Sequence, residues 1–311
     1  MGSSDTLKQL LNVFWLRPET ALWREIDIRT MKSFEMQSPS LDLGCGDGTF
    51  SFIRAGGEFD RSFDAFRSVT QLDQFFQNVD IFDSYDESLS SAVTKPPKYQ
   101  IDVGFDHKIN LLKKAGQIGL YRALKQGDAN QPLPFPDASF NSVFSNIVYW
   151  LDSPEFAISE ISRIMKPGAV ACLMLPNSTL PQFSFYNQLY VKGGDPRWKF
   201  LEMLDRGRFA DNIRQAKSLA EWQAMFKQGG LEIERHHTHL SKLAIQTWDI
   251  GLRPLFPVLL EMANELPADK LIFIKDKWMQ TMLAFIEPII KIDKEIPGGE
   301  EPAFHCFELR K

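Results

Sequence analysis

A short apolar segment that runs directly into closely spaced glycines constrains the fold more than any other feature of this chain. Residues 40–43 (Ser-Leu-Asp-Leu) predict a β-strand, and the turn Gly44-Cys45-Gly46-Asp47-Gly48 leads from it into a helix that we expect to begin near Thr49. Glycines in such a turn let a ligand approach the backbone because no Cβ stands in the way. The N-terminus of the following helix adds outward-facing N–H groups. The segment therefore predicts a strand–turn–helix unit that binds a ligand.

Two classes of ligand use this geometry, namely dinucleotides and S-adenosylmethionine. The dinucleotide fingerprint G-x-G-x-x-G requires a third glycine where this chain has Thr49, and an acidic strand end about 20 residues further on. The segment 56–97 pushes the next such strand end much further away, which disfavours a dehydrogenase. If the motif stood alone, a tight turn without any ligand would remain a third interpretation.

Strands and helices alternate along the rest of the chain. Further strands are expected at 99–105, 123–127, 140–145, 169–175, 231–237 and 303–309, and helices at 109–115, 154–165, 218–229 and 243–292. Such alternation calls for a parallel sheet with helices on both faces. We therefore predict an α/β fold with a doubly wound, mostly parallel seven-stranded sheet.

Four segments do not fit the plain alternation. Residues 1–38 are expected to form N-terminal helices, and insertions are expected at 56–97, 176–217 and 240–300. The first insertion is interpreted as partly helical, whereas the third is helical and strongly apolar. We expect these helical insertions to form a cap on the sheet.

Several motifs arrive in the order of a known family. Asp42-x-Gly44-x-Gly46-x-Gly48 resembles the first motif of class I S-adenosylmethionine-dependent methyltransferases. Later segments resemble motifs at the second, third and fourth strands and the following helix in the type 11 (ubiquinone-biosynthesis-like) branch; they are residues 103–106, 127–140, 145–150 and 161–168. The resemblance covers residues 39–176. It implies a methyltransferase domain over residues 39–311 with S-adenosylmethionine as cofactor and S-adenosylhomocysteine as product.

The resemblance assigns the methionine end of the cofactor to the glycine turn. Gly44, Cys45 and Gly46 are expected to let this zwitterionic end lie against the backbone. Asp42 is expected to orient the turn and to attract the cofactor ammonium, directly or through water.

The remaining cofactor contacts are expected at the ends of the later strands. Asp106 has two acceptor oxygens suited to the ribose diol, although it also stands where a residue would cap the next helix. His107 is a candidate to cover the adenine face, or a simple first-turn residue. Asp128 and the N–H of Ala129 are expected to bind adenine. Asn146 stands where the family's backbone carbonyl meets the cofactor ammonium, and its side chain is also suited to shape a turn.

The sequence does not identify a catalytic residue. The family often carries two histidines after the fourth strand, whereas this chain has Tyr149-Trp150. Methyl transfer from a sulfonium is an in-line displacement in which positioning supplies much of the rate, and a base is needed only if the nucleophile must lose a proton. Tyr149 and Trp150 are therefore weak candidates for the wall of the substrate pocket, with simple packing as the alternative.

Composition excludes several partners and sites. The formal charge is −5, and no run of Lys and Arg suggests nucleic acid. The three cysteines, Cys45, Cys172 and Cys306, are far apart in the sequence, which argues against disulfides and fits a reducing cytoplasm. We expect no metal site, and interpret His236, His237 and His239 as solvated loop residues. No signal peptide or transmembrane segment is expected.

The sequence thus favours methyl transfer to a small-molecule or lipid-like acceptor. A non-catalytic binding or scaffold protein of the same fold is the alternative, because the histidine pair is absent. Residues 252–260 and 283–292 are apolar with lysines nearby, so peripheral membrane contact is also considered. The acceptor, the atom that is methylated and the oligomeric state stay open.

Overall fold

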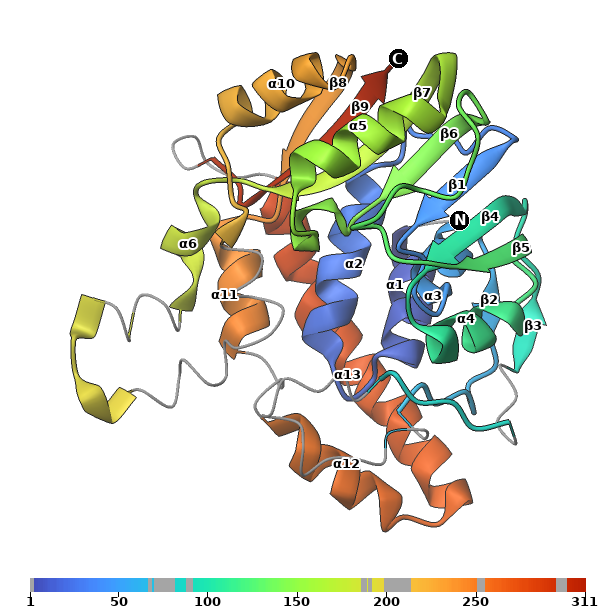
Figure 1. The fold of residues 1–311 in the computed structure, drawn as a ribbon. Helices are drawn as coiled ribbons and strands as arrows, with labels where there is room; N and C mark the ends of the chain where they lie inside the picture. Colours follow the sequence, from blue (N-terminus) through green and yellow to red (C-terminus); the bar gives the residue numbers. More distant parts are fainter. Residues whose placement is uncertain are drawn as a thin grey trace.

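A seven-stranded sheet forms the centre of the protein (Figure 1). The computed structural model describes residues 3–66, 69, 82–87, 92–185, 189, 192–198, 214–250, 255–294 and 301–311. The strand order is β5-β4-β1-β6-β7-β9-β8. The strands are β1 (Ser40–Leu43), β4 (Ile101–Asp106), β5 (Tyr121–Gln126), β6 (Phe140–Ser145), β7 (Met165–Pro176), β8 (Glu232–His239) and β9 (Phe304–Arg310).

The pairing confirms the mostly parallel sheet. β1 lies between β4 and β6 and pairs with both in parallel, whereas β9 is antiparallel to both β7 and β8. The first strand is buried at every position, as expected where helices cover both faces. Because the strand order reverses at β1, the carboxyl ends of β1, β4 and β6 border the crevice where doubly wound folds bind ligands.

Helices cover both faces of the sheet. On one face, Phe226 of α10 (Leu219–Gln228) packs against Phe307 of β9, with ring centroids 4.9 Å apart, next to α5 (Pro154–Ile164). On the other face, Met31 and Phe34, which follow α2 (Pro18–Thr30), pack against Cys172 and Cys306. Both helices begin at a capping serine: Ser153 Oγ accepts from Phe156 N, and Ser218 forms a capping box with Glu221.

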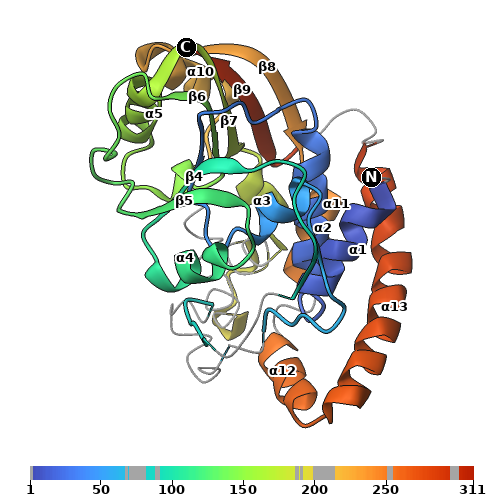
Figure 2. The same cartoon turned by 90° about the vertical axis from the view of Figure 1, so that its right-hand side faces the viewer.

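The N-terminal and C-terminal helices form one layer beside the sheet (Figure 2). α1 (Ser3–Val13) packs against α2, α3 (Thr49–Arg54) and the long helix α13 (Ala268–Lys294). α11 (Lys242–Ile250) packs against α2, and α12 (Phe256–Asn264) precedes α13. The helical region between β8 and β9 is thus present as expected. None of the helices in the described ranges is long and apolar enough to cross a bilayer.

The insertion at 56–97 is not helical where the structure describes it. β2 (Glu58–Phe59) pairs antiparallel with β3 (Val93–Lys95), so its two ends form a small ribbon. The expected helix in this insertion otherwise falls outside the described residues. In the second insertion, α6 (Leu180–Phe183) and the 3-10 helix η4 (Pro196–Trp198) are described. α4 (Ile109–Gly116) follows β4 as expected.

The three histidines were expected as solvated loop residues at the end of a strand, but the strand includes all three and only His237 among them is exposed. His236, His237 and His239 all lie within β8. His239 is buried, with Nε2 3.1 Å from Asp27 Oδ1, and His236 Nε2 lies 3.0 Å from Nδ1 of the buried His305. Burial lowers the pKa of His305 to about 3. Among the described residues, no three His, Cys, Asp or Glu side chains gather in a metal-binding arrangement.

Two cysteines that are distant in the sequence are close in space. Cys172 of β7 and Cys306 of β9 are buried with their Sγ atoms 3.7 Å apart, which is contact between free thiols rather than a bond. Cys45 is also free. Cys172 and Cys306 are thus close in space although they are far apart in the sequence, because β7 and β9 are neighbours in the sheet.

A buried lysine links α13 to the ribbon region and gives a testable pH dependence. Lys275 Nζ donates to the carbonyls of Arg61 (3.2 Å) and Phe63, and burial lowers its pKa to about 8. In the unfolded chain its pKa is about 10.4, so only the unfolded state binds this proton between those two values. The free energy of unfolding of the wild type relative to Lys275→Met should therefore rise as the pH increases from about 8 to about 10. Urea unfolding of both proteins across this range checks it; a constant difference contradicts it.

Candidate cofactor site

The glycine turn is bonded to the end of the neighbouring strand. The N–H groups of Gly44 and Cys45 donate to the carbonyl of Phe105, at 2.8 and 3.0 Å. Gly44, Gly46 and Gly48 have φ angles of +82°, +57° and +75°, a region that L side chains rarely adopt. α3 then begins at Thr49 as expected. The turn thus lies beside the end of β4, and the sequence motif has the geometry that its glycines predict.

The three glycines differ in what surrounds them. A Cβ on Gly44 would lie 2.3 Å from Ile147 Cγ1, and a Cβ on Gly48 would lie 2.8 Å from both Ile118 Cδ1 and Tyr121 Cε2. A Cβ on Gly46 would meet no described atom within 4 Å. Gly44 and Gly48 are therefore needed for close packing inside the protein. Gly46 instead leaves open space beside its backbone, where a ligand can lie.

Asp106 at the end of β4 faces this turn. Its Oδ2 accepts a hydrogen bond from Gly46 N, and its Oδ1 accepts one from Lys108 N, each at 2.9 Å. A carboxylate offers about four lone-pair positions over its two oxygens. These bonds occupy one position on each oxygen, which leaves one acceptor on each for a vicinal diol. Asp106 therefore both orders the first turn before α4 and presents a pair of acceptors beside Gly46.

His107 follows Asp106 and is largely outside the protein. Its side chain is 66% exposed, and Nδ1 lies 3.5 Å from Asp106 Oδ1. The ring therefore stands at the surface beside Asp106.

Asp42 is buried beneath the turn rather than exposed at its surface. Its Oδ2 accepts hydrogen bonds from Ser51 Oγ (2.6 Å) and Tyr121 OH (2.7 Å), which joins β1 to α3 and β5. Burial raises the pKa of the Asp42 carboxyl, although these two bonds act in the opposite direction. Burial and the nearby Asp42 hold the pKa of Tyr121 well above its usual range. This geometry supports the expected role of Asp42 in orienting the turn.

The thiol of Cys45 contributes no reactive group. Burial raises its pKa, and the carboxylates of Asp42 and Asp106 raise it further. Its Sγ lies 3.7 Å from the carbonyl of Gly46. Cys45 therefore remains a protonated thiol at neutral pH, and its N–H, bonded to Phe105, is the part that shapes the turn.

Asp128 and Ala129 lie after β5 in a turn that is anchored across the crevice. Asp128 Oδ1 accepts from the backbone N–H and the side-chain amide of Asn130, at 2.9 and 3.1 Å. Asn130 Oδ1 in turn accepts from Asp152 N at 2.8 Å. The Asp128 side chain is exposed and Ala129 is half-buried. The structure therefore places both residues at the carboxyl edge of β5, next to β4.

Asn146 and the residues after β6 close the other side of the turn. Ser145 Oγ donates to the carbonyl of Leu43 at 2.9 Å, which fixes the end of β6 against the end of β1. Asn146 is half-buried, and Ile147 packs against Gly44. The structure thus brings Gly44, Asp106 and Asn146 to one edge of the sheet from three strands.

Tyr149 and Trp150 lie in a short 3-10 helix, η2 (Val148–Trp150). Tyr149 is 6% exposed and its ring packs against Trp150 and Phe304, at centroid distances of 5.4 and 5.8 Å. Trp150 is half-buried. The two residues are together as expected, but Tyr149 belongs to the core, so Trp150 is the better placed of the two to meet a ligand.

Sequence reasoning missed Ser51, Tyr121 and Ser145. Ser51 lies nine positions after Asp42, on the first turn of α3, and this spacing is a usable signal once the helix start is known. Tyr121 is 79 positions away and reaches Asp42 only because β4 lies between β5 and β1. No local pattern reports such a contact.

Tyr121→Phe is expected to lower the free energy of unfolding by about 1.5–3 kcal/mol, because the buried Asp42 carboxylate loses a donor. Chemical denaturation measures this loss. Tyr99→Phe, in which the ring is 36% exposed, is the matched control and should change stability by less than about 0.5 kcal/mol. Equal stability of Tyr121→Phe and the wild type would show that the Tyr121–Asp42 bond contributes nothing.

The comparisons with known proteins agree with this geometry. The family described as "Methyltransferase domain" matches residues 97–173, about a quarter of the chain, which include Asp106, Asp128 and Asn146. No curated protein matches the chain.

Solved structures resemble the fold over nearly the whole chain. One is an S-adenosylmethionine-dependent methyltransferase, a possible histamine N-methyltransferase, from Thermotoga maritima; identity is 16%, coverage is 97% of this chain and 98% of that one, and the TM-score is 0.50. Another is a putative sarcosine dimethylglycine methyltransferase from Galdieria sulphuraria, with 15% identity, coverage of 95% and 85%, and a TM-score of 0.47. The likeness at these identities is one of fold. The matched methyltransferase-domain segment and the seven-stranded sheet thus give this chain a likeness to S-adenosylmethionine-dependent methyltransferases, in sequence over residues 97–173 and in fold over nearly its whole length.

Proposed function

We propose that this protein transfers a methyl group to a small-molecule or lipid-like acceptor that lies at the carboxyl edge of β6 and β7. The observation that carries the cofactor side of the proposal is the position of Asp106. Its two oxygens each keep a free acceptor position beside the open side of Gly46. The glycine turn and the Asp106 carboxylate are already in contact, so the cofactor can meet both without a rearrangement of the backbone.

We assign a different part of the cofactor to each residue at this edge. Asp106 holds the ribose diol, and His107 covers the adjacent base. The open backbone at Gly46 accommodates the methionine end, and Asp42 positions the turn from beneath. Asp128, Ala129 and Asn146 complete the contacts with the adenine and with the ammonium. The bound cofactor supplies an electrophilic methyl group on a sulfonium.

Aromatic side chains support an apolar acceptor. Phe304 pairs with Pro176, the last residue of β7. Its ring packs against Tyr149 and against Trp23 of α2, and the centroids of Trp23 and Phe304 are 5.1 Å apart. Trp248 of α11 packs against Trp23 at 5.3 Å. The acceptor side of the edge is therefore covered by rings from the helical layer. Because Phe304, Tyr149 and Trp248 are buried, we assign these rings the task of keeping water away from the acceptor side rather than of touching the acceptor.

The test is a titration followed by a transfer assay. Calorimetry with S-adenosylmethionine, S-adenosylhomocysteine and NADH should give micromolar binding for the first two and none for NADH. Transfer of labelled methyl is then measured with apolar and with polar acceptor candidates. Failure of the folded protein to bind either cofactor form would overturn the cofactor assignment. Tight binding with transfer to polar acceptors alone would overturn the apolar character of the acceptor, and binding without any transfer would favour a binding protein.

A further inference from the structure

The outer face of α13 is apolar and exposed along most of its length. Phe273, Ile274, Phe285 and Ile292 are 60%, 39%, 63% and 51% exposed. Positions 274, 285 and 292 recur at helical spacing, so these side chains share one side of the helix. From residue 273 to residue 292 this face extends for about 30 Å, at 1.5 Å per residue. Large apolar side chains rarely gather in the open on a monomer unless something binds them.

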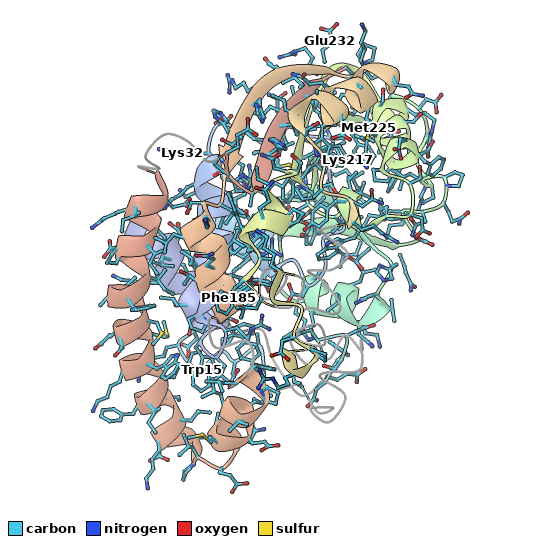
Figure 3. The ribbon with its side chains drawn as sticks, turned by 90° about the vertical axis from the view of Figure 1, so that its left-hand side faces the viewer. Trp15, Lys32, Phe185, Lys217, Met225 and Glu232 are labelled. Atoms are coloured by element: carbon cyan, nitrogen blue, oxygen red, sulfur yellow. The ribbon has the colours of Figure 1, made fainter. Side chains whose placement is uncertain are left out.

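The inner face of the same helix is firmly attached to the protein. Trp278 Nε1 donates to the carbonyl of Trp15 at 2.6 Å, and Ile286 and Ile290 are buried in the core. Figure 3 shows α13 along one margin of the molecule, with the labelled Trp15 on its inner side. The helix is thus held in place from one side, and its apolar outer face is fixed outward.

The charges on this face have one sign. Lys277 and Lys291 are exposed, and the other exposed positions between Phe273 and Ile292, all of them described, are uncharged. The carboxylates in this stretch are paired or less exposed: Asp276, whose side chain is 36% exposed, pairs with Arg61 at 3.3 Å, and Glu287 is half-buried. The protein as a whole carries a formal charge of −5, so the positive charge of this face is opposite in sign to the net charge. α12 also exposes Val258 and Met262, but Glu261 shares its surface.

We infer that the outer face of α13 docks on the surface of an anionic phospholipid bilayer. A helix with an apolar face and lysines, lying in the interface plane, buries its apolar side chains at the boundary of headgroups and acyl chains. The lysines meet the negative potential of anionic lipids. α1 lies between α13 and α3, the helix that follows the glycine turn (Figure 2). Docking would therefore leave the layer of α1 between the bilayer and the helix that follows the turn. The inference is independent of which acceptor is methylated.

Vesicle co-sedimentation of the full chain tests the inference. The wild type should pellet with phosphatidylcholine vesicles that contain phosphatidylglycerol, but not with phosphatidylcholine alone. Raising the ionic strength from about 0.01 M to about 1 M, which shortens the Debye length from about 30 to about 3 Å, should weaken binding. Phe273→Ser/Phe285→Ser should lower the partition coefficient at least about tenfold. Lys277→Gln/Lys291→Gln should lower it roughly fivefold for each lysine removed.

Matched controls separate docking from folding. Phe156→Ser on α5 and Lys227→Gln on α10 remove an exposed phenylalanine and an exposed lysine from another part of the surface. Both variants should bind vesicles as the wild type does. Thermal unfolding of every variant shows that it is folded, without reference to cofactor binding. Wild-type protein that stays in the supernatant, or phenylalanine variants that bind undiminished, would overturn the inference. Sedimentation velocity that shows a dimer broken by the same substitutions, without vesicle binding, would assign the face to a second copy and also overturn it.

Discussion

Replacement of Asp106 by alanine is expected to lower the affinity for S-adenosylhomocysteine by about 100-fold or more. The carboxylate offers one free acceptor on each oxygen beside Gly46. Hydrogen bonds to a charged group contribute about 1.5–3 kcal/mol each, and the loss of two at the lower value corresponds to more than 100-fold in the dissociation constant. Gly46 N also loses its partner, so the turn is less ordered in the variant. Calorimetric titration measures the affinity directly.

Asp102→Ala is the matched control for this prediction. Asp102 lies in the same strand, β4, but its carboxylate accepts from Ser40 N at 2.8 Å and from Arg122 at 2.9 Å, away from the glycine turn. Its loss should reduce stability and leave the cofactor affinity within about threefold of the wild type, because no proposed contact is removed. Asp106→Asn keeps one acceptor oxygen and should fall between the alanine variant and the wild type. Equal affinity in Asp106→Ala and the wild type would show that the ribose lies elsewhere.

The strand–turn–helix unit could be predicted from the sequence because its determinants are local. The strand 40–43 and the helix start at Thr49 coincide with β1 and α3, and the glycines at 44, 46 and 48 all have positive φ. The strand at 140–145 and the helix that begins after Ser218 are likewise reproduced. Each of these features depends on residues within a few positions of one another.

Contacts between distant segments could not be predicted in the same way. The bond from Tyr121 to Asp42, the contact between His239 Nε2 and Asp27 Oδ1, and the contact between Cys172 and Cys306 join residues 79, 212 and 134 positions apart. The first and third depend on strand order, and the second depends on how α2 packs against β8. A histidine near a strand end gives no local sign of whether a helix will cover it. The roles proposed for Asp128, Ala129 and Asn146 stay predictions for the same reason.

Substitutions at two glycines of the turn are expected to separate an effect on stability from an effect on cofactor affinity. Gly44→Ala is expected to cost about 2–5 kcal/mol of stability, since φ of +82° strains an L residue by about 1–2 kcal/mol and overpacking adds about 1–3. The new Cβ would lie 2.3 Å from Ile147 Cγ1. Truncation of that neighbour in Gly44→Ala/Ile147→Ala should therefore recover part of the loss, which a double-mutant cycle in urea measures.

Gly46→Ala carries the opposite expectation. Its φ of +57° costs about 1–2 kcal/mol, but no described atom lies within 4 Å of the new Cβ, so the protein stays folded. The methyl group instead enters the space assigned to the methionine end of the cofactor, and affinity for S-adenosylhomocysteine should fall at least about tenfold. Gly168→Ala, with φ of +80° and likewise no described atom within 4 Å of the new Cβ, is the control for backbone strain away from the turn. Gly46→Ala that binds as tightly as the wild type would place the cofactor away from this backbone, even if Asp106 proved essential.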